Sequence, residues 1–320
     1  MKNLIKTILD SPDIISFPPV LVDIGASGQL HKKWNLIAKH SICIAFDADE
    51  REFGFIEKKE SNFKKLFVYN CIVSDKDNSD QIFYLTRSPY CSSILKPDFK
   101  NLANYSFADI FQIINTTKLK TVSISTALKE LNINQVDWFK TDSQGIDLRL
   151  FKNLNDEIRE KIIIAEFEPG LIDAYEYEDK LYSLLEYMQN KNYWISDFIV
   201  KGNPRISAGL FNSIYSNKKL NKLLALSLKP APGWIEMTII NSFDDKNTFS
   251  KREYLLGCLF AIIEKQYGFA YELSIKGLEK YKDPIFDEIK RKVLKKVHLQ
   301  VYKLKFLLSA INRIKELISR

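Results

Sequence analysis

The 320-residue sequence has only four cysteines, Cys43, Cys71, Cys91 and Cys258, and no two of them form a CxxC pair. Their spacing disfavours both a disulfide framework and a cysteine zinc site. Long apolar runs are also missing: the longest, LLGCLFAII from Leu255, is far shorter than the roughly 20 residues that a membrane-spanning helix needs. Charges interrupt the opening MKNLIKTILDSPDII, so it does not resemble an export signal. We therefore expect a cytoplasmic protein with reduced thiols.

Acidic residues are nearly absent from the end of the chain. Residues 289–320 contain ten lysines and arginines and one acid, Glu316, while the whole chain has a net charge of +7. Five aliphatic residues recur there at helical spacing: Val293, Val297, Val301, Leu304 and Leu308. This pattern predicts a basic amphipathic helix, which packs against a partner or rests peripherally on an anionic membrane at its inner face. Few aromatic residues interleave with the lysines and no DNA-reading motif is visible, so no nucleic-acid partner is expected. The oligomeric state is left open.

Short β-rich runs alternate with amphipathic helical stretches, which is typical of a parallel α/β sheet. Seven strands are predicted, at Val20–Ile24, Ile42–Asp47, Leu66–Val73, Val136–Thr141, Lys161–Phe167, Tyr193–Val200 and Trp234–Asn241. An additional strand, Ile82–Arg87, is expected to flank the third, and helices are expected at Ser125–Leu131 and Asp179–Asn190. No regular crossover helix joins the last two strands, which favours the seven-stranded form of the doubly wound sheet. The chain after Ser250 reads as purely helical.

Two domains are expected, an α/β domain at residues 1–245 and a helical extension at residues 246–320. Residues 202–233 form an insertion between the last two predicted strands. If the sixth strand is parallel to the core strands, this insertion begins at the carboxyl edge of the sheet, where open α/β sheets bind ligands. It is then a lid over the site or a solvated excursion without chemical consequence, and both remain open.

The first strand runs into a short glycine turn, LVDIGASGQL. No GK[ST] follows, which excludes a P-loop, and Ser27 stands where a dinucleotide turn has its middle glycine. Asp23 at the strand end is unfavourable for a phosphate but attracts S-adenosylmethionine, which carries a sulfonium and an ammonium and no phosphate. The second strand ends at Asp47, where an acid accepts hydrogen bonds from ribose hydroxyls. Asp49 is the less favoured ribose ligand, and either acid has helix capping as its alternative.

Four stretches resemble the FkbM-type S-adenosylmethionine-dependent methyltransferases: LVDIGASGQLHKKW, IAFDADERE, SPYCSSIL, and VDWFKTDSQGIDLRLF followed by IIIAEFEPG. The similarity spans roughly residues 21–198, and KTDSQG with AEFEP is its most specific part. It implies a class I methyltransferase-like (Rossmann-like) fold with a seven-stranded doubly wound sheet. It also implies transfer of a methyl group to a hydroxyl oxygen, with a small molecule or a glycan as acceptor. The cofactor-binding candidates are Asp23, Gly25, Ala26, Ser27, Gly28, Asp47, Asp49 and Ser74.

The catalytic candidates follow two neighbouring strands. Asp142 ends VDWFKTD at the carboxyl edge, where a carboxylate can take the proton of an acceptor hydroxyl. Capping of the helix near Gly145 is its alternative role. Lys140 alternates with Asp142 on the strand, with a plain salt bridge as its alternative. Glu166 and Glu168 end the next strand; they either act near the sulfonium and the acceptor or pair with basic residues of the insertion.

The resemblance places three further residues, Ser92, Ser93 and Gln144, in the acceptor pocket. The oxygen ligands in this region do not have a spacing that demands a metal ion, and none is expected. Two rival functions remain. An NAD-dependent oxidoreductase is disfavoured by the missing glycine and by Asp23. A non-catalytic module of the same fold would work through residues 289–320, called here the basic tail.

Overall fold

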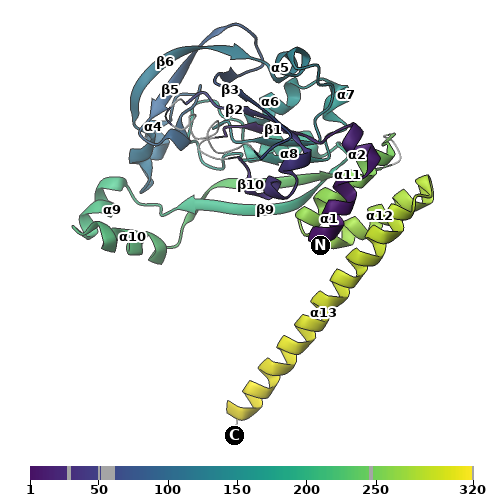
Figure 1. The fold of residues 1–320 in the computed structure, drawn as a ribbon. Helices are drawn as coiled ribbons and strands as arrows, with labels where there is room; N and C mark the ends of the chain where they lie inside the picture. The colour runs from purple at the N-terminus through teal and green to yellow at the C-terminus, as the bar shows by residue number, and fades with distance from the viewer. Residues whose placement is uncertain (27–29, 50, 52–61, 245–247, 319–320) are drawn as a thin grey trace. The chain divides into compact units, whose positions relative to one another are not determined.

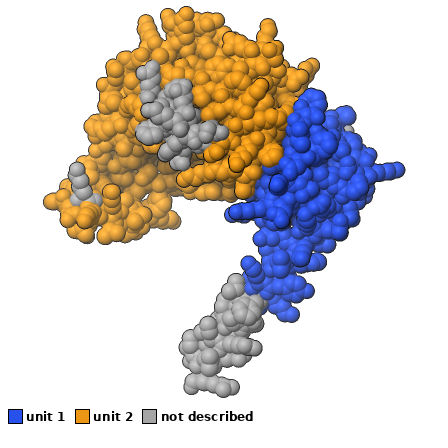
Figure 2. All heavy atoms as spheres, in the orientation of Figure 1, with its two compact units in different colours: residues 1–17, 248–320 blue, residues 18–247 orange. Residues whose placement is uncertain are grey.

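The computed structural model describes residues 1–26, 30–49, 51, 62–244 and 248–318 (Figure 1). The chain forms two compact units, coloured separately in Figure 2: residues 18–247, and residues 1–17 together with 248–320. The expected α/β domain at residues 1–245 therefore differs at its amino end. The first 17 residues belong with the C-terminal helices because α1 (Lys2–Leu9) buries one face among them.

The central sheet of residues 18–247 has seven strands: β1 (Val20–Ile24), β2 (Ile42–Phe46), β3 (Lys65–Tyr69), β7 (Trp138–Thr141), β8 (Ile164–Phe167), β9 (Tyr193–Asn203) and β10 (Ala231–Asn241). Their order is β3-β2-β1-β7-β8-β10-β9. The first five are parallel, and β10 is antiparallel to both of its neighbours. The sixth strand, β9, therefore runs in the direction of the core strands. The predicted Rossmann-like, seven-stranded sheet is confirmed.

A second sheet corrects two strand predictions. It contains β4 (Ile72–Val73), β5 (Asp80–Thr86) and β6 (Ile113–Val122), in the order β4-β6-β5. The single strand expected at Leu66–Val73 is wrong, because the chain leaves the central sheet after Tyr69 and pairs again as β4. The additional strand expected at Ile82–Arg87 corresponds to β5, but it pairs with β6 and not with the third strand. The strand β6 has the sequence IINTTKLKTV, which is largely polar and mostly exposed. It was not predicted because it contains no long apolar run.

Helices connect the strands: α4 (Phe99–Leu102), α5 (Ile124–Glu130), α6 (Asp147–Asn153), α7 (Asp156–Arg159), α8 (Leu181–Met188), α9 (Ala208–Ile214) and α10 (Lys218–Ser227). Short 3₁₀ turns are η1 (Lys32–Leu36), η2 (Ala38–His40), η3 (Pro89–Cys91) and η4 (Ala108–Phe111). Leu128 of α5, Phe151 of α6 and Leu184 of α8 join the buried core of the sheet. All five residues of β1 are buried, as in a parallel strand covered on both faces.

The other unit is helical: α1, α2 (Pro12–Ser16), α11 (Lys251–Ile263), α12 (Tyr267–Tyr281) and α13 (Pro284–Ile318). Ser250 and Glu253 form a capping box that starts α11. Along α13, Val293 is fully buried, whereas Val301 and Leu304 are more than half exposed. The predicted aliphatic stripe is therefore a packing face only in its first part. No helix within the described ranges combines the length and the apolar character needed to cross a bilayer.

Two glycines of α12 provide a matched test of this packing. A Cβ on Gly277 would lie 2.5 Å from Cε1 of the buried Phe286 ring, while a Cβ on Gly268 would have nothing within 4 Å. Gly277→Ala should lower the free energy of unfolding by about 1–3 kcal/mol through overpacking. Gly268→Ala should leave it unchanged or raise it by up to about 1 kcal/mol through helix propensity. Urea unfolding followed by circular dichroism measures both, and equal behaviour of the two variants would contradict the tight α12–α13 contact.

Candidate functional site

The ends of β1 and β7 approach each other closely at Gly25. Its φ is +75°, and a Cβ there would lie 2.1 Å from the carbonyl oxygen of Asp142, so only glycine fits without displacement. The backbone N–H of Asp142 donates to the Ile24 carbonyl oxygen at 3.0 Å. The N–H groups of Gly25 and Ala26 donate to the Phe46 carbonyl oxygen, at 3.0 and 3.2 Å. This packing brings Asp142 to the glycine turn.

Two residues before Gly25 and Asp142, Asp23 and Lys140 form a largely buried ion pair, with Lys140 Nζ 2.7 Å from Asp23 Oδ1. Burial opposes the lysine charge, but the carboxylates of Asp23 and Asp142 raise the pKa of Lys140 above its usual value. Neither Asp23 nor Lys140 lines either of the two cavities that are described next. Asp23 Oδ2 is buried and has no hydrogen-bond partner among the described residues. Lys140 therefore forms the salt bridge that was predicted as its alternative role.

A first cavity of about 70 Å³ lies over the ends of β1 and β2. Much of its wall is apolar, from residues such as Ile72, Phe83 and Ile94. Of the described residues that line it, Asp47, Asp49 and Asp142 are carboxylates and none is basic. Such a wall is electrostatically unfavourable for phosphates and favourable for a cation.

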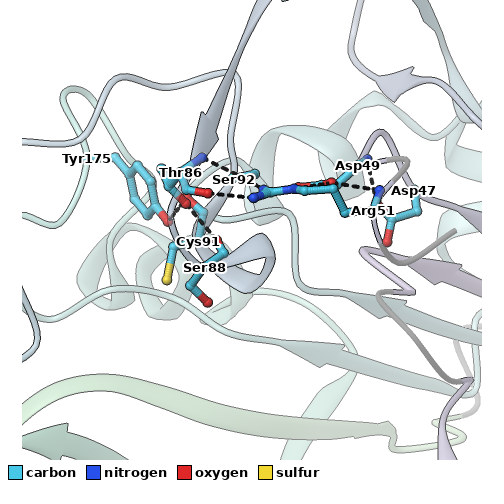
Figure 3. A network of polar contacts seen from close by, with 8 residues as sticks. All are labelled: Asp47, Asp49, Arg51, Thr86, Ser88, Cys91, Ser92 and Tyr175. Atoms are coloured by element: carbon cyan, nitrogen blue, oxygen red, sulfur yellow. Dashed lines mark hydrogen bonds and ion pairs between the residues drawn. The ribbon is translucent and has the colours of Figure 1, made fainter. Parts of the chain in front are cut away.

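Arg51 neutralises one of these acids. Figure 3 shows its side chain reaching from Asp49 toward the loop after β5. Its Nε lies 2.8 Å from Asp49 Oδ1, its Nη1 donates to the Thr86 carbonyl oxygen at 2.8 Å, and its Nη2 lies 3.0 Å from Ser92 Oγ. Burial opposes ionisation, but hydrogen bonds from Arg51 hold the pKa of Asp49 below its usual value. Arg51 therefore links the loop to the end of the second strand through Ser92 and Asp49. Asp47 Oδ1 accepts the Asp49 N–H at 2.8 Å.

A second cavity of about 360 Å³ adjoins the first. Aromatic side chains make up much of its wall: Tyr90, Phe107, Phe111, Tyr175 and Trp234. Three carboxyl groups also line it: Asp142, Glu168 and Glu178. Asp142, Gln144 and Tyr90 line both cavities. Asp142 therefore stands where a ligand in the first cavity would meet a ligand in the second.

The carboxyl groups at this boundary have different protonation states. Burial raises the pKa of Asp142 to about 6, although the Lys140 charge opposes the rise. Burial, and then the negative charge of Asp142, raises the pKa of Glu168 to about 9. Near neutral pH, Asp142 is therefore mostly ionised and Glu168 protonated. Gln144 donates its side-chain amide to Asp142 Oδ1, and the Tyr175 hydroxyl lies 2.8 Å from Gln144 Oε1.

Sequence reasoning missed Asp147, which holds this edge of the sheet together. Its Oδ1 accepts from Thr141 Oγ1 at 3.0 Å and from the Ser143 N–H at 2.9 Å. Its Oδ2 accepts from the Glu168 N–H at 2.8 Å. One buried carboxylate thus fixes the loop after β7 to the end of β8. The sequence signal was an acid directly after the turn at Gly145, which reads equally well as an ordinary first helical residue.

The remaining candidates have separate environments. Ser93 Oγ donates to the Gln144 carbonyl oxygen at 2.7 Å. Ser74 Oγ donates to Asp75 at 3.0 Å and lines neither cavity. Ser27 and Gly28 lie outside the described residues. Within the described ranges, no group of three His, Cys, Asp or Glu side chains is arranged to hold a metal ion.

Glu166 does not join Glu168 at the cavity. It accepts from Trp138 Nε1 at 2.6 Å, and Lys33 Nζ lies 3.9 Å away from it. Its basic neighbour therefore comes from η1 and not from the insertion. His31 Nε2 lies 3.4 Å from Glu166, but burial lowers the pKa of His31 to about 4, so the ring is neutral near pH 7.

Residues 32–195, just over half of the chain, match the methyltransferase FkbM domain. The chain belongs to the FkbM methyltransferase family. Comparison with curated proteins and with solved structures gave no match. The matched range of this FkbM methyltransferase runs from η1 into β9 and includes Asp47, Asp142 and Glu168. A methyltransferase with this fold requires a methyl donor, and the two adjoining cavities are the candidate sites for donor and acceptor.

The raised pKa of Glu168 predicts how stability depends on pH. A carboxyl group with an ordinary pKa near 4.3 when unfolded and about 9 when folded makes the folded protein bind more protons across that interval. The stability that protonated Glu168 contributes is therefore fully present below the pKa of the unfolded state and is lost as pH rises toward 9. Glu168→Gln stays neutral, so its urea midpoint should fall less between pH 5.5 and 8.5.

Exposed Glu186 on α8 provides the control. Glu186→Gln should keep the pH profile of the unsubstituted protein. If Glu168→Gln also keeps that profile, Glu168 does not hold a proton in the folded protein.

Proposed function

We propose that this FkbM methyltransferase transfers a methyl group from S-adenosylmethionine to a hydroxyl oxygen of a small molecule or a glycan. The observation that carries the proposal is the position of Asp142 on the wall shared by the two cavities. Methyl transfer requires donor carbon and acceptor oxygen to meet in line. A carboxylate at the meeting point of two cavities suits that requirement.

The charges that line the first cavity suit this donor better than a dinucleotide. Its carboxylates and its lack of basic residues among the described lining favour a cation and disfavour a pyrophosphate. Asp47 would accept from the ribose hydroxyls. When bound, S-adenosylmethionine supplies a methyl group activated by its sulfonium.

The second cavity has the features of an acceptor site for a ring-bearing hydroxyl compound. The rings of Phe107 and Trp234 lie 6.4 Å apart, and those of Phe111 and Tyr175 lie 5.6 Å apart. Such aromatic walls cover the apolar face of a sugar ring or of a metabolite. Protonated Glu168 would donate a hydrogen bond to an acceptor oxygen, which an ionised glutamate cannot do.

Asp142 is the proposed general base. The acceptor oxygen bonds to the methyl carbon as the carbon–sulfur bond breaks, and the hydroxyl proton moves to the carboxylate. The Gln144 amide occupies Oδ1, and the described residues supply no hydrogen bond to Oδ2. Lys140 keeps the pKa of Asp142 lower than burial alone would, so the base is available at neutral pH.

Asp47→Ala tests the donor site. Loss of hydrogen bonds to a charged group should weaken binding of S-adenosylhomocysteine by about 1.5–3 kcal/mol, measured by calorimetry. Asp80→Ala, which removes an exposed acid at the start of β5, should not change the affinity. NAD should not bind at comparable concentration. Tight NAD binding, or no effect of Asp47→Ala, would contradict the donor assignment.

Asp142→Asn tests the base. The amide keeps the shape but removes the basicity, so turnover at saturating donor should fall by about 10²–10⁴-fold. Affinity for S-adenosylhomocysteine should stay nearly unchanged. Activity is measured as transfer of the donor's methyl group to hydroxylated metabolites and glycans, which are supplied as mixtures. Asp80→Asn is the control. If the variant loses cofactor affinity but keeps its rate when saturated, Asp142 binds the donor and is not the base.

A further inference from the structure

We propose that the segment between β9 and β10 docks the protein on an anionic lipid membrane. The segment, residues 204–230, is called here the arm. It contains α9 and α10 and projects from the end of the β9–β10 hairpin (Figure 1). The proposal concerns where the protein works and does not depend on the methyl-transfer reaction.

The charge of the arm has one sign. Its sequence contains Arg205, Lys218, Lys219, Lys222 and Lys229, and it has no aspartate or glutamate. Within the described part of the chain, Lys219, Lys222 and Lys229 make no ion pair. A compact run of unpaired lysines on an exposed surface is attracted to anionic lipid headgroups.

The arm also exposes large apolar side chains beside these lysines. On α10, Leu223 is 60% and Leu226 is 84% exposed, and on α9, Leu210 is 64% exposed. Leu220, Leu223 and Leu226 are spaced three residues apart, so they form one stripe along the helix surface. Figure 2 shows the arm as a protrusion of the residue 18–247 unit. Leucines adjoining lysines on an exposed helix are typical of helices that lie in a membrane interface.

The base of the arm is fixed beside the second cavity. The Ser106 N–H donates to the Pro204 carbonyl oxygen at 3.2 Å, and Arg205 Nη1 donates to the Asn104 carbonyl oxygen at 3.1 Å. Asn203, just before the arm, and Gly233 and Trp234, just after it, line that cavity. Docking through the arm would therefore bring the cavity close to the membrane surface. An acceptor carried by a lipid would reach it there.

A membrane explains the arm better than a second copy of the chain. Two arms meeting face to face would place like charges opposite one another, which opposes association. A bilayer containing anionic lipid offers complementary charge to the lysines and an apolar layer to the leucines. Both features of the arm are then satisfied by the same surface.

Sedimentation of the full chain with vesicles tests the proposal. The protein should bind vesicles of phosphatidylglycerol mixed with phosphatidylcholine, less at high salt, and only weakly to phosphatidylcholine alone. Lys219→Glu with Lys222→Glu should weaken binding by about 25-fold or more, because each basic residue near an anionic surface contributes about fivefold. Leu223→Ser with Leu226→Ser should weaken it at every salt concentration.

Matched substitutions identify other sources of binding. Lys118→Glu with Lys120→Glu reverses two exposed charges on β6 and should leave binding unchanged. Lys303→Glu with Lys305→Glu reverses two exposed charges of α13. If the α13 pair abolishes binding while the arm variants bind normally, the basic tail is the docking site and the proposal is wrong. It is also wrong if no vesicle is bound, or if the leucine variant only changes a dimer to a monomer in light scattering.

Discussion

The close approach of β1 and β7 at Gly25 is the constraint on which the site depends. No side chain fits between the turn and the Asp142 carbonyl oxygen, so the two strand ends are held together by backbone contact. The ion pair of Asp23 and Lys140 lies two residues earlier on the same two strands. Breaking such a pair by removing one partner is strongly destabilising, because it leaves an uncompensated buried charge. Glycine and ion pair therefore act together to fix where Asp142 stands.

That fixed position explains why neighbouring carboxyl groups differ in protonation. Asp142 lies near the Lys140 charge, which limits the rise of its pKa, whereas Glu168 lies near the negative charge of Asp142. Two interacting carboxyl groups release their protons in separate steps that belong to the pair. The first proton leaves Asp142, and its departure makes the second harder to remove. One site thereby offers an ionised base and a protonated hydrogen-bond donor at the same pH.

The sequence predicted the fold better than the contacts of the site. Buried parallel strands are continuous apolar runs, so β1, β2, β7 and β8 were recognisable. β6 was not, because a strand exposed along much of its length needs no such run. Asp47 and Asp142 were placed at the edge of the sheet because each lies at the end of a predicted strand. Other side-chain contacts near the site were not predictable, because Arg51 reaches Ser92 and Trp138 reaches Glu166 only after distant segments have folded together.

The arm is a second feature for which the sequence did not predict which side chains are buried. The position of the insertion at residues 202–233, which contains the arm, allowed either a lid or a solvated excursion. The structure buries Phe211 and Ala208 of α9 but leaves Leu223 and Leu226 of α10 exposed. Contiguous exposed apolar groups on a protein surface are typical of interaction sites. Because Asn203, just before the arm, lines the aromatic cavity, a membrane that covers these leucines would also lie beside the proposed acceptor site.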